Sequence, residues 1–266
     1  MATSPIAGKV QTVLGPIAPG SLGPTITHEH LLIDFRVVFQ EPTVASQAGM
    51  AEEKLTLKNL GWIRHNWNSS FDNLTLLDED VAVTEAQQYF NAGGGAMVDV
   101  TSNGLGRDPQ ALARISRATG LNVVMGGGHY ISATHPADFE TATAEGIAET
   151  IIRDIEVGVG DTGIRTGIIG EIGVSNPWDE SERKTVQAAV IAQRQTGAPI
   201  LIHPGRDEDL PRQILEAVAE WGGDMSHTVM GHIERTIYSR DALKRVAETG
   251  AYVNFDLFGH DSSYYP

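Results

Sequence analysis

The sequence contains no cysteine, so disulfides and thiolate metal sites are excluded. Any bound metal would have to be held by histidine, aspartate and glutamate. No apolar run reaches the roughly 18 residues that a membrane-spanning helix needs. The first residues also lack the basic start and the apolar core of a secretory signal. We therefore expect no membrane association and, by default, a cytoplasmic location.

Basic residues are scarce. The 266-residue chain has 19 Lys and Arg against 34 Asp and Glu, a formal net charge of −15. Nucleic-acid-binding proteins usually present a basic face, so this balance argues against a nucleic-acid partner. The hydrophobic content of 41% is typical of globular proteins. The length matches one (β/α)8 barrel, and we interpret residues 1–266 as a single domain.

Two histidines in one apolar segment stand out. His28 and His30 lie in the run Thr25–Asp34, which has the composition of a β-strand. Residues two apart on a strand point to the same face, so both imidazoles would be presented together. Neutral imidazole is a common ligand of transition metals. The pair therefore predicts half of a metal site.

The rest of the chain alternates between helical and strand patterns. Glycine-rich residues 8–24 predict a hairpin, and residues 35–75 predict an irregular insertion after the first strand. Six helices are expected, near 78–92, 108–119, 140–157, 179–196, 208–221 and 239–248. In the fourth, Asp179 can cap the start, Glu182 follows three residues later, and Gly197 can end the helix. The seven strands are expected within 25–34, 96–101, 122–125, 166–172, 199–202, 228–230 and 251–255. Repeated βα units of this kind predict a parallel α/β sheet.

Further potential ligands follow or end three of these strands. They are Glu171, His203 and His232, each at the edge where α/β barrels place their active sites. Together with His28 and His30 they suggest two divalent ions. His28 and His30 would hold one ion, His203 and His232 the other, and the carboxylate of Glu171 would bridge them. Such a pair can share a hydroxide that acts as the nucleophile of a hydrolase.

These motifs resemble a known family. The chain resembles the phosphotriesterase family of the amidohydrolase superfamily in four motifs: the H-x-H strand, GEIG at 170–173, IHPGR at 202–206 and GHIERT at 231–236. The opening GKVQTVLG, the run ESERK at 180–184 and Phe255–Gly259 resemble its phosphotriesterase-related branch. The resemblance implies a TIM barrel with two divalent ions, usually zinc, and often a homodimer. Glu171 stands where bacterial phosphotriesterases carry a carboxylated lysine, which makes organophosphates a poor first guess as substrates.

The resemblance also implies a substrate class. The phosphotriesterase-related branch is associated with hydrolysis of small N-acyl amides, N-acetyltaurine in particular. Hydrolysis of a lactone, an ester or a phosphotriester is the alternative. Arg206 could bind an anionic group of the substrate or form a surface salt bridge, and Tyr130 could contact the substrate or only pack. His129 and His135 could support the metal ligands from behind, but we favour ordinary loop histidines. Arg235 and Glu234 are expected to pair or to face solvent.

One part of the family pattern is missing. We find no eighth βα unit and no aspartate following an eighth strand, which in the family ligates one metal and accepts the nucleophile's proton. Asp256 belongs to the seventh-strand segment and Asp261 to the loop after it, so neither is assigned that role. We expect the chain as given to be less stable and less active than a longer form. An inactive form that binds a metal or a partner is therefore a further alternative.

Overall fold

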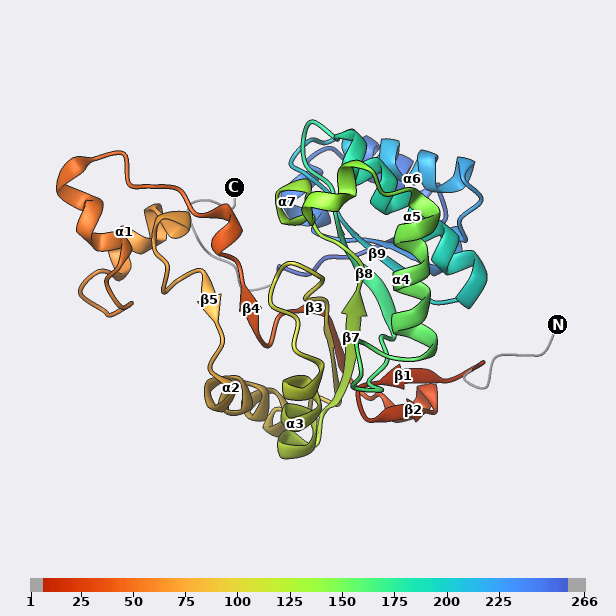
Figure 1. Cartoon of the computed structure of the whole chain (residues 1–266), viewed down its shortest axis with the longest axis horizontal. Coiled ribbons are helices and arrows are strands. Elements are labelled where there is room, and N and C mark those ends of the chain that lie inside the picture. The colour runs from red at the N-terminus through yellow and green to blue at the C-terminus, as the bar shows by residue number, and fades with distance from the viewer. Residues whose placement is uncertain (1–6, 258–266) are drawn as a thin grey trace.

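The computed structural model describes residues 7–257, which form a curled parallel sheet with helices on its outside (Figure 1). Every neighbouring pair in the seven-stranded sheet is parallel, in the order β11-β10-β9-β8-β7-β6-β3. The strands are β3 (Thr25–Glu29), β6 (Ala96–Asp99), β7 (Asn122–Gly127), β8 (Ile168–Gly173), β9 (Ile200–His203), β10 (Thr228–Met230) and β11 (Tyr252–Val253). Each strand pairs with the next one along the chain, so all carboxyl ends meet at one edge. This confirms the α/β, TIM-like architecture. Within residues 7–257 the sheet has no eighth strand, and β3 and β11 are its two edges.

The predicted helices are present within a few residues of their expected ends. They are α2 (Glu79–Asn91), α3 (Pro109–Thr119), α4 (Ala144–Glu156), α5 (Glu180–Thr196), α6 (Leu210–Glu220) and α8 (Arg240–Ala247). A short helix, α7 (Ile233–Thr236), was not predicted, because four residues are too few to show a helical period. Asp179 caps α5 by accepting from the Glu182 N–H at 2.8 Å, and the helix ends at Gly197 in the left-handed region.

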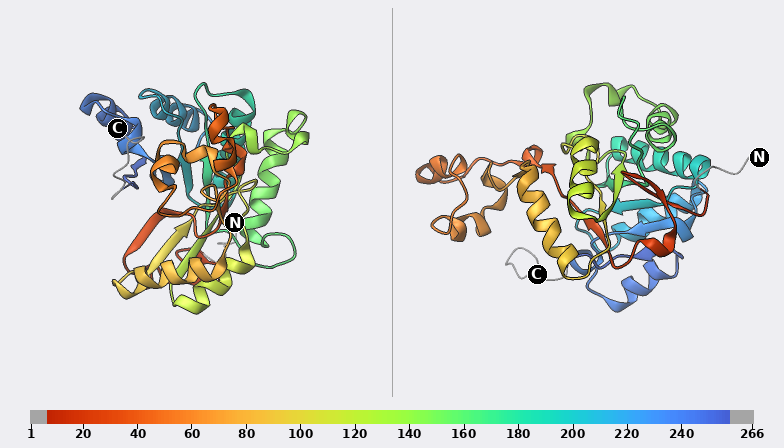
Figure 2. Two further views of the ribbon diagram at one scale, coloured as in Figure 1. Left: turned by 90° about the vertical axis from the view of Figure 1, so that its left-hand side faces the viewer. Right: turned by 90° about the horizontal axis from the view of Figure 1, so that it is seen from below.

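The N-terminal hairpin and the insertion are also found. Strands β1 (Val10–Thr12) and β2 (Gly15–Ile17) pair antiparallel. The insertion holds α1 (Leu60–His65) between β4 (Ile33–Asp34) and β5 (Thr75–Leu76), and it extends away from the barrel (Figure 2). Short 3-10 turns lie at Pro19–Ser21, Arg36–Val38, Ala45–Ala51, Trp67–Ser69, Ser132–Thr134, Ala137–Glu140 and Met225–His227.

The core lies between the sheet and its outer helices. Ile169 of β8 and Ile200 of β9 pack in one cluster with Ile151 of α4 and Val186 of α5. All six residues of β8 are buried, as expected for a strand covered on both faces. Burying one such aliphatic side chain contributes roughly 1.5–3 kcal/mol. The core therefore fixes the strands whose carboxyl ends carry the potential ligands.

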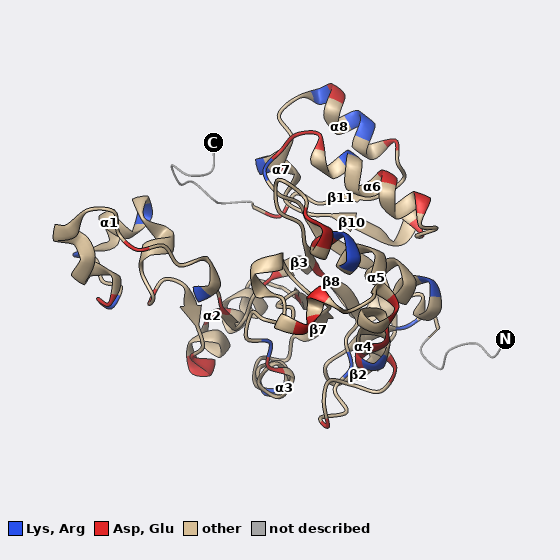
Figure 3. Cartoon of the chain, turned by 45° about the horizontal axis from the view of Figure 1, so that its top comes forward, with Lys and Arg blue, Asp and Glu red and all other residues tan. Residues whose placement is uncertain are grey.

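The outer surface carries both signs of charge, for example along α6 and α8 (Figure 3). Among the described residues, no helix is both long enough and apolar enough to cross a membrane.

Candidate metal centre

The carboxylate of Glu171 lies at the centre of the predicted ligands. Its Oε2 is 3.0 Å from His28 Nε2 and 2.7 Å from His203 Nδ1. Its Oε1 is 3.2 Å from His30 Nε2. His232 Nε2 lies 2.9 Å from His203 Nδ1 and 4.0 Å from Glu171 Oε2. The structure thus brings all five residues together, from four different strands and the ends that follow them.

Four of these residues form a compact set. One ligand atom each of His28, Glu171, His203 and His232 lies within 4.8 Å of all the others. His30 faces the opposite oxygen of Glu171, and the strand register shifts between Ile26 and Glu29, just before it. His28 and His30 thus contact different oxygens of the same carboxylate. Which histidine serves which ion stays a prediction.

Backbone geometry explains two of these placements. Gly170 has φ of +141°, and a Cβ there would lie 2.4 Å from the Leu201 carbonyl oxygen, so only glycine lets β8 approach β9 next to Glu171. His232 has φ of +54°, an unfavourable left-handed conformation for a residue with a side chain. Its backbone N–H donates to Asp256 Oδ2 at 3.1 Å, which helps to hold this conformation.

Asp256 and Thr101 orient three of the imidazoles. Asp256 lies 2.9 Å from His28 Nδ1 and 2.7 Å from His232 Nδ1, and so directs Nε2 of both rings towards the cluster. Thr101 Oγ1 donates to the Leu32 carbonyl at 3.1 Å and lies 3.0 Å from His30 Nδ1. Second contacts of this kind fix the orientation of metal-binding histidines. The sequence reasoning did not assign this positioning role to either residue, and no local motif marks it.

The donor set fits a cation. Burial lowers the pKa of His28, but the Glu171 and Asp256 carboxylates outweigh it and raise that pKa to about 10. Burial raises the pKa of Glu171, but His203 and His28 hold it well below its usual range. His28 lies between the buried carboxylates of Glu171 and Asp256, and positive charge at this position offsets the cost of burying them. A divalent ion would supply that charge in place of the proton on His28.

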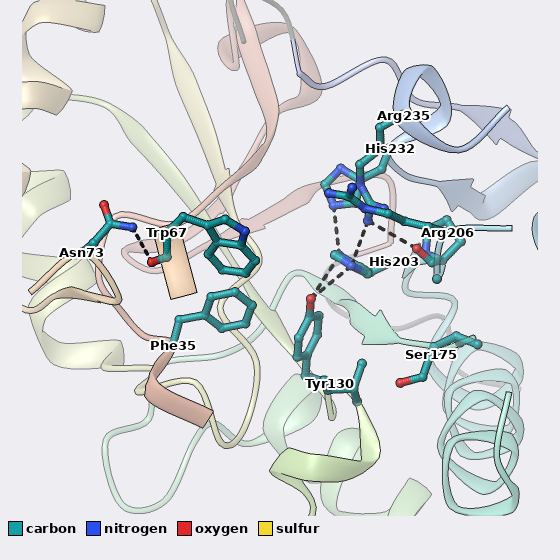
Figure 4. A pocket seen from close by; sticks show the side chains of 13 residues that line it. Phe35, Trp67, Asn73, Tyr130, Ser175, His203, Arg206, His232 and Arg235 are labelled. Atoms are coloured by element: carbon teal, nitrogen blue, oxygen red, sulfur yellow. Dashed lines mark hydrogen bonds between the residues drawn. The ribbon is translucent and has the colours of Figure 1, made fainter. Parts of the chain in front are cut away.

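A cavity of about 390 Å³ opens beside this cluster (Figure 4). The Tyr130 hydroxyl lies 3.1 Å from His203 Nε2, and Phe35 and Trp67 form part of the wall. Arg206 also lines the cavity, and it is exposed to solvent. Tyr130 and Arg206 thus both line the cavity, and their contact with a substrate stays a prediction.

Arg235 does not face solvent. Of the two expectations for it, pairing or exposure, exposure is wrong: the residue is only 7% exposed and lines the same cavity. Its Nη2 lies 2.9 Å from His203 Nε2 and 3.3 Å from the Pro204 carbonyl. The reason is α7, which turns the chain directly after His232 and directs the side chain inwards.

His129 and His135 are not part of the cluster around Glu171. His135 Nε2 contacts the Tyr130 carbonyl at 2.9 Å, and His129 packs against Phe139, so both lie behind the cavity wall. Glu234 accepts from the Leu257 N–H at 2.5 Å. Asp261 falls outside the described residues.

Comparison with known proteins identifies the family of this chain. The phosphotriesterase family matches residues 8–266. Human N-acetyltaurine hydrolase is 43% identical over 263 residues, covering 98% of this chain and 75% of the human protein. The phosphotriesterase-related protein of Nematostella vectensis is 40% identical over 97% of this chain and 75% of its own length. The crystal structure of a resiniferatoxin-binding protein from Rhodobacter sphaeroides superposes with a TM-score of 0.93 at 36% identity, over 96% of this chain and 72% of that one. The chain therefore belongs to the phosphotriesterase family and is a metal-dependent hydrolase.

Proposed function

We propose that this chain hydrolyses a small anionic N-acyl amide, such as N-acetyltaurine, with two zinc ions. The observation that carries the proposal is the convergence of four imidazoles on the two oxygens of Glu171. The relatives named for N-acetyltaurine hydrolysis, at about two-fifths identity, support the substrate.

The residues of the site would have three roles: binding the ions, orienting the metal ligands and lining the substrate cavity. His28, His30, His203, His232 and Glu171 would hold the ions. When bound, the ions would lower the pKa of a water molecule towards neutrality and polarise the scissile carbonyl. Asp256 and Thr101 contact the Nδ1 atoms of three imidazoles and would keep these rings oriented for metal binding. Tyr130, Phe35 and Trp67 line the cavity in which the acyl group would be held.

Zinc is the proposed metal because four imidazoles and a carboxylate are ligands that it accepts readily. Histidine and carboxylate sites also take other divalent ions. Metal content of purified protein, and reconstitution of the stripped protein with Zn²⁺, Mn²⁺ or Co²⁺, distinguish these metals. Highest turnover with an ion other than Zn²⁺ would overturn this part of the proposal.

The substrate is tested by comparing turnover of N-acetyltaurine, a γ-lactone and an aryl phosphotriester by one metal-loaded preparation. We expect the highest kcat/KM with N-acetyltaurine. The solved lactonase and organophosphate-hydrolase structures are similar to this chain at 23–24% identity, which supports only the fold. Turnover of the phosphotriester alone would contradict the substrate proposal but leave the metal centre in place.

The remaining expectations from the sequence stay predictions. They are a homodimer, a cytoplasmic location and the absence of nucleic-acid or membrane partners. A non-catalytic metal-binding role is separated from hydrolysis by the same assay, because it predicts full metal content with no turnover of any of the three substrates.

A further inference from the structure

The cavity beside the cluster differs in charge from the rest of the chain. The chain has 34 acidic residues against 19 basic ones, yet the described residues lining the cavity include two arginines and no carboxylate. Many of the acidic residues instead belong to the outer helices and loops (Figure 3). A cavity of this composition favours an anionic ligand.

The two arginines differ in burial. Arg235 is 7% exposed; its Nη2 donates to the Pro204 carbonyl at 3.3 Å and lies 2.9 Å from His203 Nε2. Arg206 is an exposed residue on the loop after β9. A buried cation attracts an anion more strongly, because the effective dielectric constant is lower and salt screens it less. The held guanidinium also loses less side-chain entropy on binding.

Arg235 is also close to the reacting centre. One imidazole separates it from Glu171, since His203 contacts Glu171 through Nδ1 and Arg235 through Nε2. Figure 4 shows Tyr130, His232 and Arg235 converging on His203, with Phe35 and Trp67 farther across the cavity. A substrate with its acyl carbonyl at the cluster and a short acidic tail would reach both groups.

We propose that Arg235, more than Arg206, binds the anionic end of the substrate, a carboxylate or sulfonate. Arg235 thereby selects short N-acyl amides with an acidic tail over neutral ones. The proposal rests on the proposed function and adds the residue that determines its specificity. The competing role is purely positional: Arg235 would only hold the His203 ring.

Paired substrates separate the two roles. We would measure kcat/KM for N-acetyltaurine and for the neutral analogue N-acetylethanolamine in wild type, Arg235→Met, Arg235→Lys and Arg206→Met. Arg245→Met, on the exposed side of α8, is the control. We expect Arg235→Met to lower the ratio of kcat/KM for N-acetyltaurine to kcat/KM for N-acetylethanolamine about 10- to 100-fold. Loss of a charge-assisted contact predicts a change of this size. Arg235→Lys should recover part of this ratio, and Arg206→Met should change it less than Arg235→Met.

Equal losses on both substrates in Arg235→Met would overturn the proposal in favour of the positional role. A larger change of the ratio in Arg206→Met would overturn it in favour of the exposed arginine. Taurine binding, measured by calorimetry on the same metal-loaded proteins, gives a test that needs no turnover. If wild type hydrolyses neither amide, the proposed function fails; weaker taurine binding in Arg235→Met than in Arg206→Met would still support the anion site, and equal binding would contradict it.

Discussion

Asp256 contacts His28 and His232 with different carboxylate oxygens, and it also accepts from the His232 backbone N–H. An amide in its place could accept from only one of the two rings. We therefore expect Asp256→Asn to weaken zinc affinity about 10- to 100-fold, as for other residues that orient metal ligands. Competition with a chromogenic chelator measures this affinity.

The matched control is Asp241→Asn, since Asp241 is exposed in the first turn of α8. Unchanged zinc affinity in Asp256→Asn would contradict the positioning role of Asp256.

His129 gives a pH prediction independent of the metal. It is 6% exposed, and burial lowers its pKa to about 4, with His135 and Arg107 acting in the same direction. The unfolded chain therefore binds this proton more readily than the folded chain. Its contribution to stability is fully present above pH 6.5 and is lost as the pH falls from 6.5 through 4, by an amount on the order of 3 kcal/mol.

This prediction is checked by urea unfolding at several pH values. The free-energy difference between wild type and His129→Gln should shrink as the pH falls from 6.5 to 4. His65→Gln, a change at an exposed histidine, should leave the pH dependence unchanged. A pH-independent difference for His129→Gln would show that the folded chain binds this proton as readily as the unfolded one.

At the scale of elements, Glu182 of α5 links the loops after β7 and β8. Its fully buried carboxylate accepts from the Ser132 N–H at 3.1 Å, the Ser175 N–H at 2.8 Å and the Ser175 hydroxyl at 2.7 Å. The sequence pattern suggested a local capping role for this side chain, but the structure shows it between two loops beside the cavity.

We expect Glu182→Gln to lower the free energy of unfolding by about 1–3 kcal/mol, because an amide group would face buried donors. It should also raise KM, since Ser175 lines the cavity. Denaturant unfolding and steady-state kinetics measure both effects. Glu180→Gln, in the same turn but with a 93% exposed side chain, is the control. Equal stability of the two variants would rule out the link.

Much of this element pattern was predictable from the sequence. Gly197 and the caps mark the ends of helices locally, and H-x-H, GEIG and GHIERT lie at strand ends, where chain order alone places side chains at one edge. Arg235 and Asp256 could not be assigned in this way. Their roles depend on α7, which is too short to show a period, and on the curl of the sheet, which brings β11 to β3.

At the scale of the whole molecule, the site joins the two edges of the sheet. The β3 and β11 segments are linked through His28 and Asp256 at 2.9 Å and through Thr27 and Asn254 at 3.1 Å. The potential ligands thus come from nearly the whole width of the curled sheet, namely from β3, β8, β9 and the segment after β10. Binding of ions at this site should stabilise the fold as a unit.

We expect metal removal with a chelator to lower Tm, and restored Zn²⁺ at a hundred times its Kd to return about 2.7 kcal/mol of stability for each ion bound. Differential scanning calorimetry measures the change. If Tm is the same with and without metal, the ions bind elsewhere or also bind the unfolded chain.

The most direct test of the metal centre is the metal content of the purified chain, measured by mass spectrometry for wild type and Glu171→Ala. The account predicts about two divalent ions per wild-type chain and well below one in Glu171→Ala, because the Glu171 carboxylate would be a ligand of both ions. Less than one ion per wild-type chain, or equal content in the two proteins, would contradict it.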